Sequence, residues 1–252
     1  MKKLMAANWK MYKFAGEAGE TAAALRARLD GKLPADREVL VIPPFTALGA
    51  AGQALAGAAG FALGAQNFYP SKQGAFTGEI APDMLLDAGC AYALAGHSER
   101  RHILGEDDAM VGRKVGFGLA AGLAMILCVG EKIEERQAGQ VEAVLARQLA
   151  AGLAEVPADV SPDTLAVAYE PVWAIGTGLT AGPAEVADAH KVVRAHLIER
   201  FGPQTGAAVR ILYGGSVKPG NAGELLGIDN VDGVLVGGAS LEAESFAAIV
   251  TA

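Results

Sequence analysis

The stretch Leu165-Ala-Val-Ala-Tyr-Glu-Pro-Val-Trp-Ala-Ile-Gly-Thr-Gly178 joins a short apolar run, an acidic residue and a segment bounded by proline and glycine. The run Leu165–Tyr169 is typical of a buried strand, and Glu170 stands directly at its end. A strand end aims a carboxylate rigidly, and the segment after it can close over a ligand as one piece. This arrangement suits proton transfer on a shielded substrate. A solvated glutamate in an ordinary strand-to-helix loop is the alternative, so other segments must decide.

Similar apolar runs recur from one end of the chain to the other. They are nearly all apolar rather than alternating, as expected when both faces of a parallel sheet are covered. The expected strands are Leu4–Ala7, Val39–Ile42, Phe61–Ala65, Tyr92–Ala95, Met125–Val129, Leu165–Tyr169, Val209–Tyr213 and Gly233–Val236.

Helix signals fill the gaps between these runs. We expect one helix to begin at Pro82 and stop at Gly89, and a longer one to run from Pro183 to about Phe201. The charged, Ala-rich stretch Glu131–Ala151 has apolar residues at helical spacing and predicts one surface helix with a single buried stripe.

The fold class is indicated by the number of units and by where the polar residues lie. Eight strand–helix units in 252 residues match the size of a (βα)8 TIM barrel, and no linker divides residues 1–252 into separate domains. A doubly wound open sheet would concentrate its site at one switch point. Here polar and special residues come after many strands, which favours the barrel, where all strand ends ring one face. They are Asn8, Lys10, Gln66, Asn67, His97 to Glu99, Glu170, Gly214 to Ser216, Gly237 and Gly238.

Composition and charge exclude several classes of protein. Hydrophobic residues make up 52% of the chain, enough for a sizeable core, and the net charge of −7 argues against nucleic-acid binding. Cys90 and Cys128 are the only cysteines, too few for a secreted disulfide scaffold. The apolar stretch before Asn8 is too short for a signal peptide, and the uncharged run between Lys114 and Glu131 is too short and too rich in glycine for a membrane span. We therefore expect a cytoplasmic protein without a membrane partner.

Two glycine-rich turns near the end of the chain predict a phosphate site. Tyr213-Gly-Gly-Ser216 comes after the seventh expected strand, and Val236-Gly-Gly-Ala239 after the eighth. Glycines let backbone N–H groups approach an anion closely, and Ala239–Glu242 can start a helix whose dipole points the same way. Simple tight turns are the alternative interpretation of each pair, but two pairs after consecutive strands favour phosphate binding.

Three further side chains near strand ends are candidates for catalysis. Lys10, with Asn8, comes after the first strand and can neutralise a phosphate and developing oxyanion charge, although most lysines are simply solvated. His97 comes after the fourth strand, and no partner at ligand spacing accompanies it, so we expect no metal. A short helix beginning after His97 would hold its imidazole neutral.

A match to a dinucleotide-binding pattern is weak. Gly176-Thr-Gly-Leu-Thr-Ala181 fits GxGxxG/A, but a loop precedes it where a strand is required. Ser216 also lacks the last glycine of a GxSxG nucleophile motif.

The segments together resemble the triosephosphate isomerase family over essentially the whole chain and in order. They are Ala7–Met11, Gly64–Asn67, Gly74–Glu79, Gly96–Arg101, Leu127–Glu131, Ala168–Gly178, Tyr213–Val217 and Val236–Gly238. The resemblance implies interconversion of dihydroxyacetone phosphate and D-glyceraldehyde 3-phosphate, a step of glycolysis and gluconeogenesis, without a cofactor.

The resemblance also implies a role for each matching residue. Glu170 would shuttle the proton between two substrate carbons, and a neutral His97 would polarise the carbonyl oxygens, a pairing that is a standard worked case for this enzyme. Lys10 with Asn8 would stabilise the enediolate, and Glu99 would support Lys10. N–H groups for the phosphate would come from Gly176, Ser216, Gly237 and Gly238. The lid would be Val172, Trp173, Ala174, Ile175, Gly176 and Thr177.

The resemblance further implies a homodimer, in which a loop like Gln73–Glu79 brings Thr77 near the active site of the neighbouring subunit. Leu179 stands after the lid where many relatives carry lysine, and we expect it to alter surface contacts of the lid end rather than chemistry.

Two rival functions remain. A catalytically silent barrel that binds sugar phosphates would be expected to lose Glu170, His97 or Lys10, and all three are present. A Schiff-base aldolase would need a lysine within a strand, and the expected strands contain none.

Overall fold

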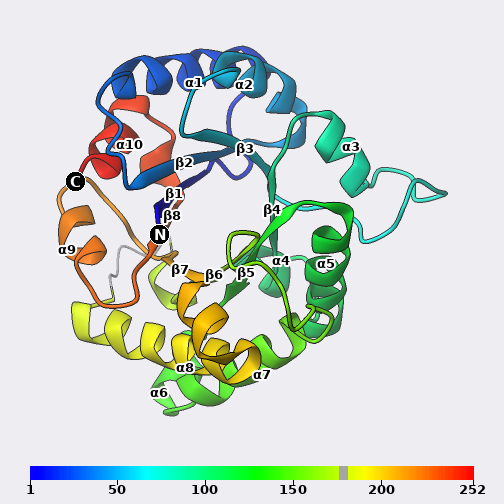
Figure 1. The fold of residues 1–252 in the computed structure, drawn as a ribbon, viewed down its shortest axis with the longest axis vertical. Helices are drawn as coiled ribbons and strands as arrows, with labels where there is room; N and C mark the ends of the chain where they lie inside the picture. The colour runs from blue at the N-terminus through cyan, green and yellow to red at the C-terminus, as the bar shows by residue number, and fades with distance from the viewer. Residues whose placement is uncertain (176–180) are drawn as a thin grey trace.

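A computed structural model describes residues 1–175 and 181–252. Within these residues the strands form a closed barrel in which neighbours keep chain order, and every adjacent pair is parallel (Figure 1). The strands are β1 (Lys3–Asn8), β2 (Arg37–Ile42), β3 (Phe61–Ala65), β4 (Tyr92–Ala95), β5 (Ala124–Val129), β6 (Leu165–Tyr169), β7 (Arg210–Tyr213) and β8 (Gly233–Val236).

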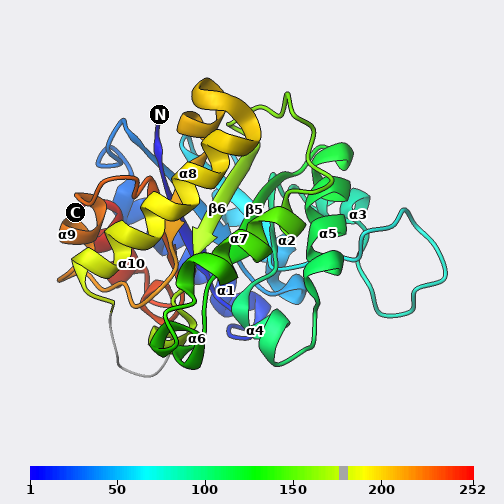
Figure 2. The same cartoon turned by 90° about the horizontal axis from the view of Figure 1, so that it is seen from below.

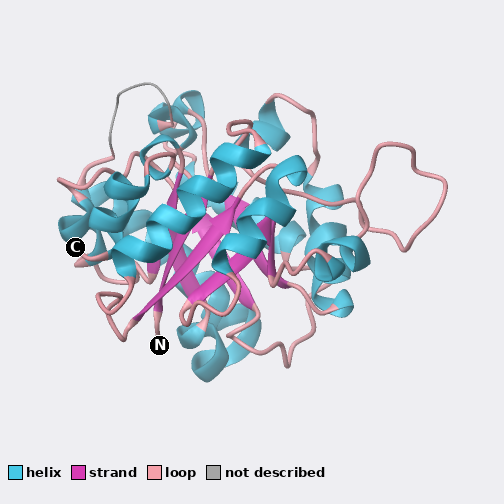
Figure 3. Cartoon of the chain, turned by 90° about the horizontal axis from the view of Figure 1, so that it is seen from above, coloured by secondary structure: helices cyan, strands magenta, loops and turns pink. Residues whose placement is uncertain are grey.

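The helices lie outside the barrel and surround it (Figures 1 and 3). The α-helices are α1 (Ala15–Leu29), α2 (Leu48–Leu55), α3 (Pro82–Asp87), α4 (Ser98–His102), α5 (Asp108–Ala121), α6 (Ile133–Gln137), α7 (Val141–Gly152), α8 (Pro183–Ala208), α9 (Ala222–Leu226) and α10 (Ala243–Val250). Three 3-10 turns are η1 (Phe45–Ala47), η2 (Val172–Ala174) and η3 (Gly238–Ser240). Across the described part of the chain, no helix has the length and apolar character needed to cross a membrane.

The strands bury both faces, as their apolar runs predict. On β1, Leu4 and Ala6 belong to the cluster inside the barrel, whereas Met5 and Ala7 pack outward against the helices. The barrel closes where Leu4 pairs with Gly233 of β8. Gly233 has a φ of 147°, and a Cβ there would overlap the Leu4 backbone, so this closing contact requires glycine. The pairing of β1 with β8 excludes the doubly wound open sheet.

The helix predictions were partly right. α3 begins at Pro82 as predicted, and α8 begins at Pro183 and is interrupted at Gly202, which has a φ of 78°. The single helix predicted over Glu131–Ala151 is wrong. Gly139, with a φ of 69°, separates α6 from α7. Left-handed backbone at one residue ends a helix even where the flanking residues favour it.

The amino end of the barrel is plugged by polar side chains that contact one another. Arg210 Nη1 donates to Glu38 Oε2 at 2.7 Å, and Arg210 Nη2 donates to Tyr92 Oη at 3.0 Å. Tyr92 Oη in turn donates to Glu38 Oε1 at 3.0 Å. These residues lie at or next to the first positions of β7, β2 and β4, so the network ties three strands together below the apolar interior.

Candidate active site

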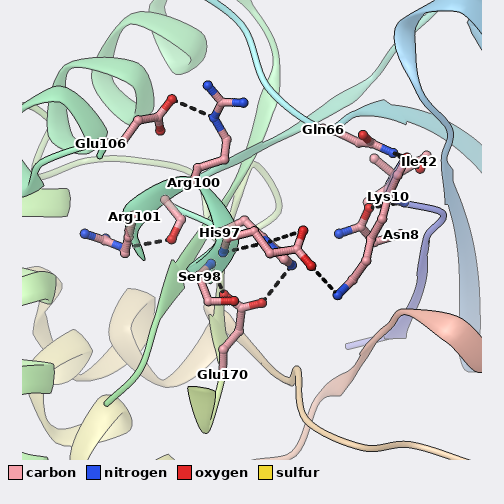
Figure 4. A network of polar contacts seen from close by, with 12 residues as sticks. Asn8, Lys10, Ile42, Gln66, His97, Ser98, Arg100, Arg101, Glu106 and Glu170 are labelled. Atoms are coloured by element: carbon pink, nitrogen blue, oxygen red, sulfur yellow. Dashed lines mark hydrogen bonds and ion pairs between the residues drawn. The ribbon is translucent and has the colours of Figure 1, made fainter. Parts of the chain in front are cut away.

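A cavity of about 360 Å³ opens at the carboxyl ends of the strands. It brings together most of the residues that the sequence singled out, from the ends of β1, β4, β6, β7 and β8 and the segments that follow them. Figure 4 shows Asn8, Lys10, His97 and Glu170 of this set. Its lining includes Asn8, Lys10, His97, Glu170, Ala174, Ile175, Ser216, Gly237 and Gly238.

Glu170 lies one residue beyond β6, where the strand alternation points its side chain into the barrel mouth. The side chain is 2% exposed, and each carboxylate oxygen has a partner. Oε1 lies 3.0 Å from His97 Nε2, and Oε2 accepts from the Ser98 N–H at 2.8 Å (Figure 4). The carboxylate is therefore shielded from water and aimed by two groups at the start of α4.

Two glycines make room for Glu170, a role that the sequence pattern did not assign to them. A Cβ on Gly130 would overlap the Glu170 carbonyl group. A Cβ on Gly214 would lie 2.9 Å from Glu170 Cγ. Both glycines come directly after buried strands, and a glycine at that position is the only sign of this role in the sequence. The sequence does not show that Glu170 is the residue that occupies the space.

His97 caps the N-terminus of α4. Its Nδ1 accepts a hydrogen bond from the Glu99 backbone N–H at 3.3 Å. A ring nitrogen that accepts carries no proton, so the neutral imidazole holds its proton on Nε2. Nε2 faces Glu170 and the cavity. The helix cap thus selects the tautomer that can donate a hydrogen bond to a ligand in the cavity.

The surroundings of His97 oppose the expectation that a short helix keeps its pKa low. Burial lowers the pKa of His97, but the negative charge and hydrogen bond of Glu170 raise it, and Glu99 raises it further. Lys10 acts in the lowering direction, and the net pKa lies above its ordinary value. Burial is the largest single influence on this pKa, but Glu170, 3.0 Å away, and Glu99 together outweigh burial and Lys10.

Lys10 is held in an uncommon backbone conformation beside the cavity. Its φ is 52°, a left-handed value that is costly for a residue other than glycine. Asn8 Oδ1 accepts from the Lys10 N–H at 3.0 Å, and Gln66 Nε2 donates to the Lys10 carbonyl at 2.7 Å. The ammonium lies 2.6 Å from Glu99 Oε1. The sequence marked Gln66 only as a polar residue after a strand, whereas here it fixes the backbone of Lys10.

The glycine-rich turns also line the cavity, and the turn after β8 lies beside Lys10. Ser216, Gly237 and Gly238 line it, and a Cβ on Gly237 would lie 3.1 Å from Lys10 Cε. The helix expected from Ala239 is instead the short turn η3, and α10 begins only at Ala243. Backbone N–H groups of the turns, rather than a long helix dipole, are therefore the groups that this part of the cavity offers to an anion.

Glu131 holds the start of the expected lid. Its backbone carbonyl accepts from the Val172 N–H at 3.1 Å. Its buried Oε1 accepts from Tyr169 Oη at 3.1 Å and from Trp173 Nε1 at 2.9 Å, and it pairs with Arg136 at 3.1 Å. The sequence pattern assigned Glu131 no role. Gly176, Thr177 and Leu179 lie outside the described residues.

Thr77 does not line the cavity of its own chain. It is exposed in the long connection between β3 and α3, which extends away from the barrel (Figures 1 and 2). In the described residues, no three His, Cys, Asp or Glu side chains gather as a metal site.

Comparison with known proteins gives the same family along the whole length. The family model described as triosephosphate isomerase matches residues 3–252. The chain belongs to the triosephosphate isomerase family. It is 63% identical to the triosephosphate isomerase of Nitratidesulfovibrio vulgaris over 252 residues, which is 100% of both chains. It is 53% identical to that of Chloroflexus aurantiacus over 98% of this chain and 97% of the relative.

A solved structure shares the fold. The crystal structure of triosephosphate isomerase from Bartonella henselae superposes with a TM-score of 0.88 at 39% identity. The match covers 99% of this chain and 98% of that one.

Proposed function

We propose that the protein, a single barrel domain, interconverts dihydroxyacetone phosphate and D-glyceraldehyde 3-phosphate through an enediolate, with no cofactor. The observation that carries the proposal is the 3.0 Å pair of the buried Glu170 and His97 side chains at one cavity. Family membership supports the substrate. On the same ground we place the protein in glycolysis and gluconeogenesis, in the cytoplasm.

Glu170 is the proposed base. A substrate carbonyl oxygen takes the place of Glu170 Oε1 as acceptor of the His97 Nε2–H, which frees the carboxylate to face a carbon. Glu170 then removes a proton from C1 of dihydroxyacetone phosphate, and the electron pair forms the carbon–carbon double bond of the enediolate. His97 Nε2 gives its proton to the C2 oxygen and takes up the proton of the C1 hydroxyl, and return of the carbon-bound proton from Glu170 to C2 then gives the aldehyde. A positioned acid–base pair contributes about 10²–10⁴-fold in rate.

His97 acts in its neutral form in this scheme. Displacing the Glu170 oxygen from Nε2 weakens the largest influence that raises the pKa of His97. The Glu99 N–H bonded to Nδ1 disfavours a second ring proton, because two donors would then face each other. His97 can donate from Nε2 to the forming oxyanion, and Lys10 supplies a fixed positive charge beside it.

The glycine turns and the lid complete the proposed site. Ser216, Gly237 and Gly238, together with Gly176, offer backbone N–H groups to the substrate phosphate. An enediolate phosphate readily eliminates phosphate in water. The segment Val172–Thr177 closes over it and excludes water, and Glu131 anchors the first residues of this lid.

We also propose a homodimer. A second cavity beside the active site is lined by polar residues that include Asn8, Lys10, His97 and Glu99, and by the apolar residues Met11, Leu94, Ile103 and Leu104. Met11 is 94% exposed there, and Ile103 is 76% exposed. Exposed apolar side chains of this kind are typical of an interface. In the proposed dimer, the loop of residues 73–79 of a second copy, including Thr77, covers them. Sedimentation at micromolar concentration tests it, and a stable single chain would contradict it.

The activity has a direct test. The purified protein is given glyceraldehyde 3-phosphate, and formation of dihydroxyacetone phosphate is coupled to NADH oxidation by glycerol-3-phosphate dehydrogenase. We expect rapid turnover that does not change when chelators are added. Absence of turnover by the folded protein would overturn the proposal in favour of a silent sugar-phosphate-binding barrel.

A further inference from the structure

We propose that Gln148, on the outer helix α7, is a positioning residue for Glu170. The inference rests on the proposed function, because it concerns the base of that reaction. Gln148 is 2% exposed and does not line the cavity. It acts through the backbone of Gly130, so it is not itself a catalytic residue.

The side-chain amide of Gln148 holds both backbone groups of Gly130. Gln148 Oε1 accepts from the Gly130 N–H at 2.7 Å, and Gln148 Nε2 donates to the Gly130 carbonyl at 3.1 Å. α7 packs on the outside of β5 (Figure 2). The hydrogen bonds to Gly130 place the Gln148 amide beside the end of that strand. The Gln148 side chain therefore supplies both backbone hydrogen bonds that Gly130 would receive from a neighbouring strand within a sheet.

Backbone hydrogen bonds join the ends of β5 and β6 on either side of Gly130. The Glu170 N–H donates to the Val129 carbonyl at 2.7 Å, and the Val172 N–H donates to the Glu131 carbonyl at 3.1 Å. Gly130 lies between these two bonds, with its own N–H and carbonyl turned to Gln148. Gln148 thus completes the hydrogen bonding of the segment around the end of β5, whose carbonyls accept from Glu170 and from Val172 at the start of the lid.

Gly130 is also in direct contact with the base. A Cβ at Gly130 would overlap the carbonyl of Glu170, so the two backbones already touch. A shift of Gly130 must move Glu170, because no space separates them. A misplacement of about 1 Å in a catalytic group costs on the order of 10²-fold in rate. Small displacements of Gly130 are therefore expected to lower kcat.

The test compares two buried positions of α7 in the whole protein. Gln148→Met keeps the length of the side chain but loses both hydrogen bonds. Leu149→Ala, at a neighbouring buried residue, lowers stability without removing a polar contact of Gly130. For wild type and both variants we would measure kcat, KM, Tm and the primary isotope effect with substrate deuterated at the abstracted position.

For Gln148→Met we expect kcat to fall about tenfold, KM to stay within twofold and the isotope effect to rise as proton transfer becomes limiting. Leu149→Ala should lower Tm at least as much and leave kcat and the isotope effect unchanged. An unchanged kcat in Gln148→Met, or losses that simply track Tm in both variants, would overturn the inference. If Gln148→Met does not fold, Gln148→Glu, which keeps an acceptor for the Gly130 N–H, is measured by the same criteria. Inactive wild type would refute the proposed function itself, and this inference with it.

Discussion

The two ends of the barrel use buried polar groups in opposite ways. At the amino end, Arg210, Glu38 and Tyr92 point inward and satisfy one another within 3.0 Å. At the carboxyl end, Glu170 and His97 also pair, but they face a cavity in which a ligand can replace either partner. One end is filled and the other is left open.

The difference arises from the residues that flank the apolar interior at each end of the strands. The amino end carries long side chains that meet over the core. The carboxyl end carries Gly130, Gly214 and Gly237, whose missing side chains leave room beside Glu170 and Lys10. Polar groups that bond to one another serve stability, whereas those left facing a cavity serve chemistry. Substitutions at the two ends should therefore separate stability from activity.

The largest effect is expected for Glu170→Gln. Loss of the base should lower kcat by about 10²–10⁴-fold. Tm should stay the same or rise, because a buried carboxylate is removed while a hydrogen-bond acceptor remains. Steady-state kinetics and thermal unfolding of the same sample check this. A kcat within tenfold of wild type would exclude Glu170 as the base.

Arg210→Met should do the reverse at the amino end. It leaves Glu38 without its ion pair, and we expect the free energy of unfolding to fall by about 3 kcal/mol, at the lower end for buried pairs because the Glu38 side chain is 24% exposed. kcat should remain within twofold. Denaturant unfolding measures this, with Arg28→Met in the exposed pair with Glu244 as control. The control should cost less than about 1 kcal/mol. Equal losses of unfolding free energy in Arg210→Met and Arg28→Met would contradict a stabilising role for the buried network at the amino end.

His190 lies in neither end and should contribute a pH dependence of its own. Its Nδ1 donates to the Asn230 carbonyl at 2.8 Å, and burial lowers its pKa to about 4. The unfolded chain binds a proton near pH 6.5, so stability falls as pH drops from about 6.5 to 4, by up to about 3 kcal/mol. Unfolding of His190→Gln should show a shallower slope in that range. If the unfolding free energies of wild type and His190→Gln change equally with pH in this range, His190 is not the source of the pH dependence.

Gly130→Ala tests the open end without touching a polar side chain. The added Cβ overlaps the Glu170 carbonyl, so the base must move. We expect kcat to fall by about 10²-fold. The control is Gly49→Ala, because a Cβ at Gly49 meets open space. Gly139 would be a poor control, because its positive φ strains any other residue. Gly49→Ala should leave kcat unchanged. Full activity in Gly130→Ala would show that the contact is not needed.

The strands could be predicted because burial on both faces leaves a clear apolar run. The helix over Glu131–Ala151 could not, because Ala-rich and charged residues on both sides of Gly139 give no sign of its left-handed backbone. Candidate polar residues such as His97 and Lys10 stand out after strand ends. Gln148 does not, because its role depends on a contact with a residue 18 positions away in the chain. Periodicity predicts that a side chain is buried, but not which group it holds.

The most direct test of the central claim is the reaction of dihydroxyacetone phosphate in D₂O, monitored by NMR of the trapped aldehyde product. Proton transfer through Glu170 lets the proton exchange with solvent while it is on the carboxylate. We predict deuterium at C2 of the product from wild type, and negligible product from Glu170→Gln in the same time. Product that carries no deuterium, as a direct hydride shift would give, would contradict proton transfer through Glu170.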